Sequence, residues 1–312
     1  MTQVLSSLLS ATSQGVLWGI MALGVYITYR TLNVSDLTVD GSFATGGAVC
    51  AILIVNGVNP VISILIAIIA GMITGVVTGI LITYFEIPAI LAGILTQIGL
   101  YSINLRIMAR SNLPLLRVPT LFKSLSELTG LNQTLSTLLV GVIISIMVIS
   151  FLYWFFGTEI GSAIRATGNN ERMASALGVN TSAGFTNTKI LGLMISNGLI
   201  ALSGALVTQS QGYADVKMGT GAIVIGLASI VIGEVVFGSK HSFSVKLMSI
   251  VIGSIVYRII IAIVLQFGLN TDDLKLLTAL LVGISLAVPI LVGRSKQVGT
   301  YKRLTKEGQN NA

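Results

Sequence analysis

Long stretches of apolar residues without a charged side chain dominate the chain. The longest charge-free runs are residues 1–29, 41–85, 87–105, 128–158, 190–214 and 276–293. A helix needs about 20 apolar residues to cross the hydrocarbon core of a bilayer. The run 41–85 is long enough for two crossings separated by a turn at residues 56–60. The pattern therefore predicts a set of membrane-spanning helices.

These runs predict an all-α, polytopic membrane protein with about nine transmembrane helices. The expected spans are residues 4–29, 42–56, 60–84, 87–105, 134–157, 184–211, 219–237, 243–267 and 274–293. We expect residues 1–293 to form one transmembrane domain, followed by a basic cytoplasmic tail at residues 294–312. No basic segment precedes the first apolar run, in contrast to a cleaved signal peptide, so we expect this span to remain in the mature protein.

The composition supports the same class. Charged residues make up 9% and apolar residues 54% of the chain, whereas soluble domains contain about 25% charged residues. The net charge of +7 does not indicate nucleic-acid binding, because basic residues in membrane proteins mark cytoplasmic loops. The single cysteine, Cys50, falls within an expected span, so no disulfide framework is expected.

The distribution of basic residues predicts the orientation. If residues 159–189 and the tail lie in the cytoplasm, the N-terminus lies outside. The internal loops then hold eleven basic residues: Arg30, Arg165, Arg172, Lys189, Lys240, Lys246, Arg294, Lys296, Lys302, Arg303 and Lys306. The external loops hold six: Arg106, Arg110, Arg117, Lys123, Lys217 and Lys275. The positive-inside rule favours this orientation.

Glycines recur at a spacing that is typical of close helix packing. Gly71, Gly75 and Gly79 form two overlapping GxxxG units, and Gly15 with Gly19 forms another. Small residues at this spacing allow the backbones of two membrane helices to approach closely. We interpret these glycines as packing positions within one bundle rather than as a contact specific to a dimer.

Two polar segments beside apolar runs are typical of interrupted or re-entrant helices. They cover residues 33–41 and 211–221, and each combines acidic and hydroxyl residues with glycine. Irregular backbone at membrane depth is tolerated where it is buried in protein or lines a wet cavity, and such breaks mark transport sites. The predicted translocation pathway therefore comprises Asp36, Thr38, Asp40, Gly41, Ser42, Asp215, Met218, Gly219 and Gly221. Ordinary interfacial loops are the alternative.

Residues 159–180 form a polar island between two apolar segments. Thr167 or Asn169 is suited to cap a short helix here, and Glu171 near its start complements the helix dipole. Gly178 is suited to end it. The helix then has a small apolar face made of Met173, Ala174 and Leu177. We expect this face to dock on a partner; the alternative is an amphipathic helix on the lipid surface.

The sequence contains no motif for catalysis or ATP binding. There is no G-x-x-x-x-G-K-[ST] phosphate-binding loop and no H-E-x-x-H metal motif. His241 is the only histidine, and no cysteine or acidic cluster lies beside it. We therefore expect no enzyme activity, no catalytic residue, no metal site and no cofactor in this chain.

Three blocks resemble the permease subunits of bacterial ATP-binding-cassette (ABC) importers of the branched-chain amino acid and ribose type. They are residues 15–49, residues 161–180 with the stretch Gly-Asn-Asn-Glu, and residues 203–238 with Val-Ile-Gly-Glu. The chain is most similar to the subgroup of tryptophan/tyrosine and other amino-acid permeases. That similarity is carried by residues 165–171, 192–197 and 232–234.

The resemblance implies a permease subunit, not an enzyme, in the bacterial cytoplasmic membrane. It implies two permease subunits, as a homodimer of this chain or a close heterodimer. It also implies two cytoplasmic ABC ATPase subunits that bind ATP and Mg²⁺, and an extracytoplasmic substrate-binding protein. Residues 159–180 would couple the permease to the ATPase. The implied coupling residues are Gly168, Asn169, Asn170, Glu171, Met173, Ala174, Leu177, Gly178 and Val179. The implied solute is an amino acid, with aromatic ones first.

Two other functions stay open. The wider family also carries nucleosides and sugars, so a permease for either is an alternative. An ion-coupled secondary transporter would use carboxylates such as Asp36, Asp40 or Glu234 as coupling sites. The polar island at residues 159–180 argues against that function, because a self-contained carrier does not need it.

Charged residues near or within the spans receive structural roles. We expect Arg258 to snorkel toward the outer leaflet or to join a structural pair. Arg30 is close in sequence to Asp36 and Asp40 and is expected to neutralise them. Glu234 is expected to act as a structural partner or gate element.

Overall fold

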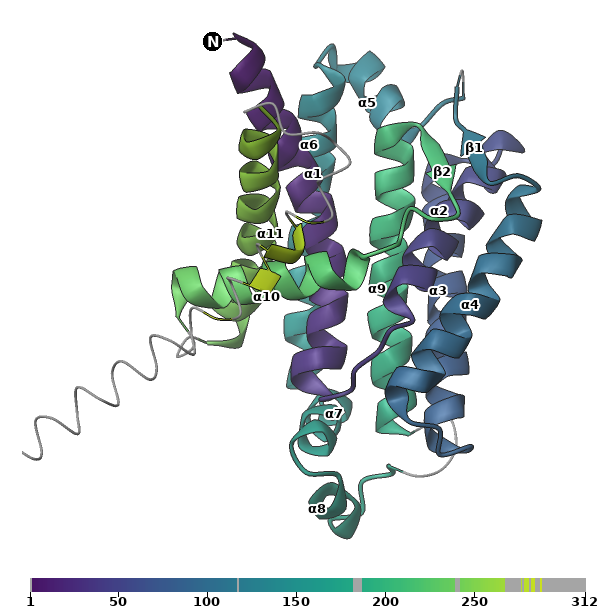
Figure 1. Ribbon diagram of the computed structural model, residues 1–312, viewed down its shortest axis with the longest axis vertical. Helices are drawn as coiled ribbons and strands as arrows, with labels where there is room; N and C mark the ends of the chain where they lie inside the picture. Colours follow the sequence, from purple (N-terminus) through teal and green to yellow (C-terminus); the bar gives the residue numbers. More distant parts are fainter. Residues whose placement is uncertain are drawn as a thin grey trace, which may run out of the picture.

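A computed structural model describes residues 2–116, 118–181, 187–238 and 242–266, and the isolated positions 276, 278–280, 282, 283 and 287. Within these residues the chain is a bundle of helices, most of which run along one common direction (Figure 1). The predicted tail at residues 294–312, most of the predicted span 274–293, Lys240 and His241 lie outside the described residues.

Among the described residues, six helices are long and apolar enough to cross a membrane. They are α1 (Thr2–Tyr26) with its π-helical continuation η1 (Ile27–Thr31), α3 (Pro60–Thr83), α4 (Ala89–Met108), α6 (Gln133–Gly157), α9 (Thr188–Gln211) and α11 (Phe243–Gln266). Two further apolar helices, α2 (Val39–Val55) and α10 (Ala222–Phe237), are shorter. Each coincides with a predicted span, so the prediction of an all-α polytopic membrane protein is confirmed.

Short elements occupy the two ends of the bundle (Figure 1). Helix α5 (Leu121–Thr129) and a two-stranded ribbon lie at one end, and helices α7 (Glu159–Asn169) and α8 (Glu171–Ala176) lie at the other. In the ribbon, β1 (Asn112–Pro114) pairs antiparallel with β2 (Tyr213–Asp215), with Asn112 opposite Asp215. The ribbon therefore lies at the end of the bundle opposite the polar island of residues 159–180. The predicted orientation requires this separation.

The turn between α2 and α3 follows from its sequence. Gly57 has a φ of 84°, which an L side chain rarely adopts. The Asn59 side chain then accepts a hydrogen bond from the Val61 amide at 2.9 Å, and Pro60 occupies the first helical position. The predicted turn at residues 56–60 is confirmed.

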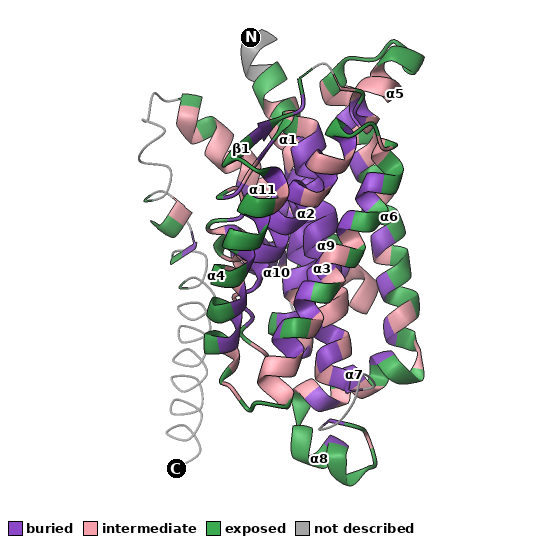
Figure 2. Cartoon of the chain, turned by 90° about the vertical axis from the view of Figure 1, so that its right-hand side faces the viewer, coloured by how far each residue is buried: buried purple, intermediate pink, exposed green. Residues whose placement is uncertain are grey.

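Glycines bring the helices at the centre of the bundle into close contact. A Cβ atom at Gly71 or Gly75 on α3 would collide with the backbone of α9, and one at Gly15 on α1 would lie 2.7 Å from the Ile255 Cα on α11. Helices α2 and α9 form much of the buried centre (Figure 2). The interpretation of these glycines as packing positions within one bundle is confirmed.

The outward faces of the peripheral helices are apolar. Ile69 on α3, Ile98 on α4 and Ile146 on α6 are 55%, 63% and 58% exposed. Aliphatic side chains exposed in rows along three long helices would face water in a soluble protein, whereas in a bilayer they contact lipid or another subunit.

Candidate functional site

The first interruption lies between η1 and α2. Residues 32–38 leave the helix, and Asn33 has a φ of 55°. Asp36 holds the start of the next helix, because its Oδ1 accepts a hydrogen bond from the Thr38 amide at 2.8 Å. Asp36 is 2% exposed, so this irregular backbone is buried in protein. The predicted break at residues 33–41 is therefore present in the structure.

The second interruption precedes α10. Residues 216–221 form turns after β2, and Gly221, with a φ of 85°, immediately precedes the first residue of the helix. Asp40 of α2 accepts hydrogen bonds from the amides of Gly221 at 2.9 Å and Ile223 at 3.1 Å. A carboxylate from one interrupted helix thus caps the free amides of the other, where a negative charge complements the helix dipole.

The two breaks, about 180 residues apart in sequence, are in direct contact. A Cβ atom at Gly219 would collide with the carbonyl oxygen of Asp40, so only glycine fits this position. Met218 lies beside α9, with its Sδ 3.5 Å from the Thr208 hydroxyl. Asp215 is placed apart from this contact, in the ribbon, where it accepts a hydrogen bond from the Asn112 side chain at 3.2 Å.

One arm of a buried hydrogen-bond network leads away from Asp36 through hydroxyl groups. The Thr38 hydroxyl lies 2.8 Å from that of Thr78 on α3, and the Thr78 hydroxyl donates to that of Thr96 on α4 at 3.0 Å. All three threonines are buried. This arm ties the break to two neighbouring helices.

A second arm starts at the other oxygen of the same carboxylate. The Asn197 amide on α9 donates to Asp36 Oδ2 at 2.9 Å. The Ser42 hydroxyl donates to the Asn197 carbonyl at 2.6 Å and lies 2.6 Å from the hydroxyl of Thr74 on α3. The predicted pathway residues Asp36, Thr38 and Ser42 therefore belong to one network.

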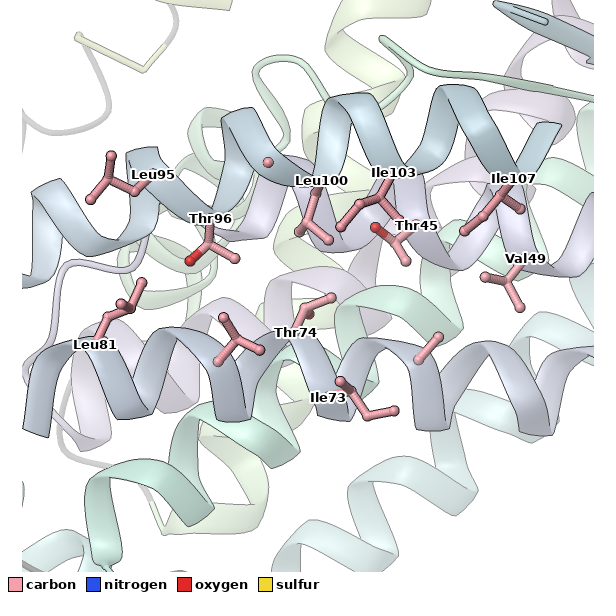
Figure 3. Close-up of a pocket in the computed structure, with 13 residues that line it drawn as sticks. Thr45, Val49, Ile73, Thr74, Leu81, Leu95, Thr96, Leu100, Ile103 and Ile107 are labelled. Carbon is pink, nitrogen blue, oxygen red and sulfur yellow. The ribbon is translucent and has the colours of Figure 1, made fainter. Parts of the chain in front are cut away.

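Both arms end at a cavity of about 480 Å³ between α2, α3 and α4. Its walls are mostly aliphatic, and its hydroxyl groups come from Thr45, Thr74 and Thr96 (Figure 3). Aliphatic side chains such as Leu95, Leu100 and Ile103 surround the same space. A small solute with an apolar body and a few polar groups suits such a lining.

Four members of the network were not predicted from the sequence: Thr74, Thr78, Thr96 and Asn197. They are polar residues scattered along the mainly apolar helices α3, α4 and α9, and the hydroxyls of such residues commonly bond to their own helix backbone. Thr74 makes that bond as well, to the Gly71 carbonyl at 2.7 Å. The polar residues were therefore visible in the sequence, but their pattern did not distinguish a network between helices from hydrogen bonds within one helix.

The polar island folds into two helices rather than one. The Thr158 side chain caps α7, and the Asn170 side chain caps α8 by accepting a hydrogen bond from the Met173 amide at 3.0 Å. The predicted caps at Thr167 and Asn169 are wrong, because both residues lie inside α7. Gly178 has a φ of 86°, so its predicted role as the stop after this segment is confirmed.

Helix α8 and its C-cap residue Leu177 expose two large apolar side chains. Met173 is 49% and Leu177 is 75% exposed, whereas Ala174 is fully buried. The expectation that Ala174 belongs to the exposed face is therefore wrong. Glu171 forms an ion pair with Lys189 at 2.6 Å, which ties the start of α8 to the start of α9.

Arg30 has a partner other than the expected one. Arg30 pairs with Glu234, while Asp36 and Asp40 are held by the amide groups described above. The expected neutralisation of these two aspartates by Arg30 is thus wrong. The expectation that Glu234 has a structural partner is confirmed.

Arg258 takes the second of its two expected roles. Its guanidinium lies 4.3 Å from the centre of the Trp18 ring, which is a cation–π contact. Helices α1 and α11 run antiparallel, because Gly15 packs on Ile255 and Gly19 packs on Val251. The backbone of Arg258 therefore lies beside the part of α1 that precedes Gly15, whereas Trp18 follows Gly15. The side chain therefore reaches along α1 toward the end that carries α7, which is opposite to outward snorkelling.

These features define a polytopic membrane protein with interrupted helices, a class that includes transport subunits. The chain matches the family described as branched-chain amino acid transport system / permease component over residues 7–288. It belongs to this family, and it is an ABC permease subunit rather than an enzyme. Membership of this family of importers implies an ATPase and a binding protein as partners.

Curated relatives agree with this family. A protein named tyrosine transport system permease protein, from Clostridioides difficile, is 41% identical over 89% of this chain and 90% of its own length. An uncharacterised protein of Rickettsia prowazekii is 35% identical over 90% and 96%. The autoinducer 2 import system permease protein LsrC of Yersinia pseudotuberculosis is 27% identical over 69% and 58%. No solved structure shows significant similarity to the chain.

Proposed function

We propose that this permease carries an aromatic amino acid, with tyrosine first. The observation that supports this solute most strongly is the 41% identity, over nearly the whole chain, to a protein named as a tyrosine transport permease. The aliphatic cavity between α2, α3 and α4 agrees with it, because an aromatic side chain needs apolar walls and a few polar partners.

A sugar-like solute is the second candidate, since the LsrC permeases are named for autoinducer 2 import. Their similarity to this chain is lower and covers only 69% of it. A sugar also needs more hydrogen-bond partners than the three threonine hydroxyls that line the cavity supply.

The proposed pathway passes the cavity and the contact between the two breaks. Thr74 and Thr96 would touch the solute, and Asp36 would hold both threonines in place through the two arms of the network. The contact of Asp40 with the start of α10 would join the two interrupted helices. A movement of either helix would then be transmitted to the other, which suits a pathway that must open and close.

The proposed assembly contains two copies of this chain in the bacterial cytoplasmic membrane. Each copy would have nine membrane segments, with α2 and α10 as shorter discontinuous ones and residues 274–293 as the ninth. α7 and α8 would face the cytoplasm and dock on two ATPase subunits, which bind the ATP and Mg²⁺. A separate extracytoplasmic protein would deliver the solute.

Substitution of the threonines that line the cavity tests the proposed pathway. Thr74→Val and Thr96→Val remove one hydroxyl each at nearly constant volume. Thr129→Val in α5, an exposed position at the end of the bundle, is the matched control. The assay is uptake of labelled tyrosine into vesicles that contain the importer. We expect a raised KM for both cavity variants and an unchanged KM for the control; an unchanged KM in all three would contradict the pathway.

A further inference from the structure

Three basic side chains from three different elements line one cavity at the end of the bundle that carries α7. They are Arg30 from η1, Arg165 from α7 and Lys246 from α11, and the cavity has a volume of about 340 Å³. Tyr26 and Thr31 belong to the same lining. This cavity is separate from the one between α2, α3 and α4.

The cavity carries an excess of positive charge. Glu234 pairs with Arg30, and among the described residues neither Arg165 nor Lys246 forms an ion pair. The Arg165 guanidinium donates a hydrogen bond to the Phe156 carbonyl and stacks on two aromatic rings, with 4.7 Å to the centre of the Phe243 ring. The carboxylate of Glu234 therefore neutralises one of three cations, and among the described residues the other two have no carboxylate partner.

The backbone around the cavity holds these side chains in place. Arg30 lies in a π-helical turn closed by a hydrogen bond from the Leu32 amide to the Ile27 carbonyl at 2.9 Å, and such turns are frequent at functional sites. A Cβ atom at Gly168 would collide with the Thr31 carbonyl, so α7 is pressed against this turn. The C-terminal end of α7 carries a partial negative charge and favours cations. The attraction for an anion therefore comes from the basic side chains and not from the helix end.

We propose that this cavity binds the phosphate group of an anionic phospholipid. Guanidinium groups match the geometry of a phosphate, and a lysine adds a point charge. The cavity lies at the ends of the spans α1 and α11, which is the level of the lipid headgroups. Basic pockets between membrane helices on the cytoplasmic side recognise such headgroups.

Exposed apolar side chains that follow Glu234 in sequence favour a lipid over a free phosphate ion. Val235 and Val236 follow Glu234 directly at the end of α10 and are 48% and 58% exposed. They lie next in sequence to the residue that pairs with Arg30. An acyl chain would cover these valines while its headgroup occupied the cavity, whereas inorganic phosphate would leave them uncovered.

Lipid retention by the purified protein tests the proposal. The protein in mild detergent is mixed with phosphatidylglycerol or phosphatidylcholine of the same acyl chains, and bound lipid is counted by native mass spectrometry. Lys246→Gln is the main variant, because it removes a charge without breaking an ion pair in the described structure. Arg165→Gln is the second variant. Lys123→Gln in α5, at the other end of the bundle, is the matched control.

We expect the wild type and Lys123→Gln to retain phosphatidylglycerol in preference to phosphatidylcholine. Each cavity variant should weaken that retention by about fivefold, the effect of one basic residue near an anionic membrane surface. Equal retention in the wild type and in both cavity variants would overturn the proposal. A loss of the same size in Lys123→Gln would also overturn it, because it would show an effect of net charge alone.

Two further arms separate the possible sources of the anion. Inorganic phosphate at millimolar concentration should not displace the lipid; displacement at that concentration would mean a site for free phosphate. The wild type could retain neither lipid, while Lys246→Gln no longer co-purifies with the ATPase. That result would mean that the cavity receives an acidic side chain of the ATPase and that the lipid proposal is wrong. None of these arms uses the transported solute, so failure here leaves the proposed transport function untouched.

Discussion

The substitution Leu177→Arg tests the proposed docking of the ATPase on α8. Leu177 is 75% exposed in the chain alone, so most of its surface is available to a partner. Complete burial of a leucine side chain contributes about 1.5–3 kcal/mol, and three quarters of that is about 1–2 kcal/mol. An arginine buried there without a partner would cost about 3–5 kcal/mol in addition.

The sum, at least about 4 kcal/mol, corresponds to a weakening of the docking constant of about 10³. Folding of the permease itself should change by no more than about 0.5 kcal/mol, because the position is at the surface and outside any ion pair. We therefore expect Leu177→Arg to insert and fold normally, to lose the ATPase during co-purification, and to abolish uptake.

The same substitution at the other end of the bundle provides the control. Leu128 in α5 is 84% exposed, so Leu128→Arg adds the same charge at a similarly exposed leucine. It should retain both the ATPase and uptake. If both variants co-purify with the ATPase at wild-type yield, α8 is not a docking helix and the reasoning is refuted.

Three other predictions concern the packing. Gly75→Ala should lower the melting temperature in detergent, because its Cβ would collide with a backbone carbonyl of α9 at a cost of about 1–3 kcal/mol. The control Gly99→Ala should leave the melting temperature unchanged, because nothing lies within 4 Å of its Cβ, and equal melting temperatures of the two variants would contradict the packing. Asp40→Ala should destabilise the start of α10 by about 0.5–2 kcal/mol, seen as faster amide exchange confined to its first turn; unchanged exchange there would contradict the cap. A double-mutant cycle of Trp18→Leu and Arg258→Met should give a coupling of about 0.5–2 kcal/mol, and strict additivity would exclude the cation–π contact.

The hydrophobic pattern predicts the helices of this protein because a bilayer requires long apolar segments. A charge-free run of about 20 residues has few alternatives to a spanning helix. Element ends were less predictable: α2 begins at Val39 rather than at residue 42, because the buried Asp36 and Thr38 organise its first turn. The ribbon of β1 and β2 was not predicted, because strands of three residues have no pattern of their own.

The two breaks were predictable, but their contacts were not. Polar residues with glycine beside apolar runs indicated residues 33–41 and 211–221. The pairing of Asp40 with Gly221, and of Arg30 with Glu234, joins residues that lie 181 and 204 positions apart. Proximity in sequence favoured the wrong partner for Arg30, because the fold carries Asp36 and Asp40 away into the bundle.

Uptake by the reconstituted importer tests whether ATP drives the transport of tyrosine through this permease. The permease, its ATPase and its binding protein are placed in vesicles with labelled tyrosine outside, ATP inside and no ion gradient. We predict accumulation of tyrosine above the external concentration that requires ATP, the ATPase and the binding protein together. Accumulation by the permease alone, driven by a proton or sodium gradient and independent of ATP, would contradict it.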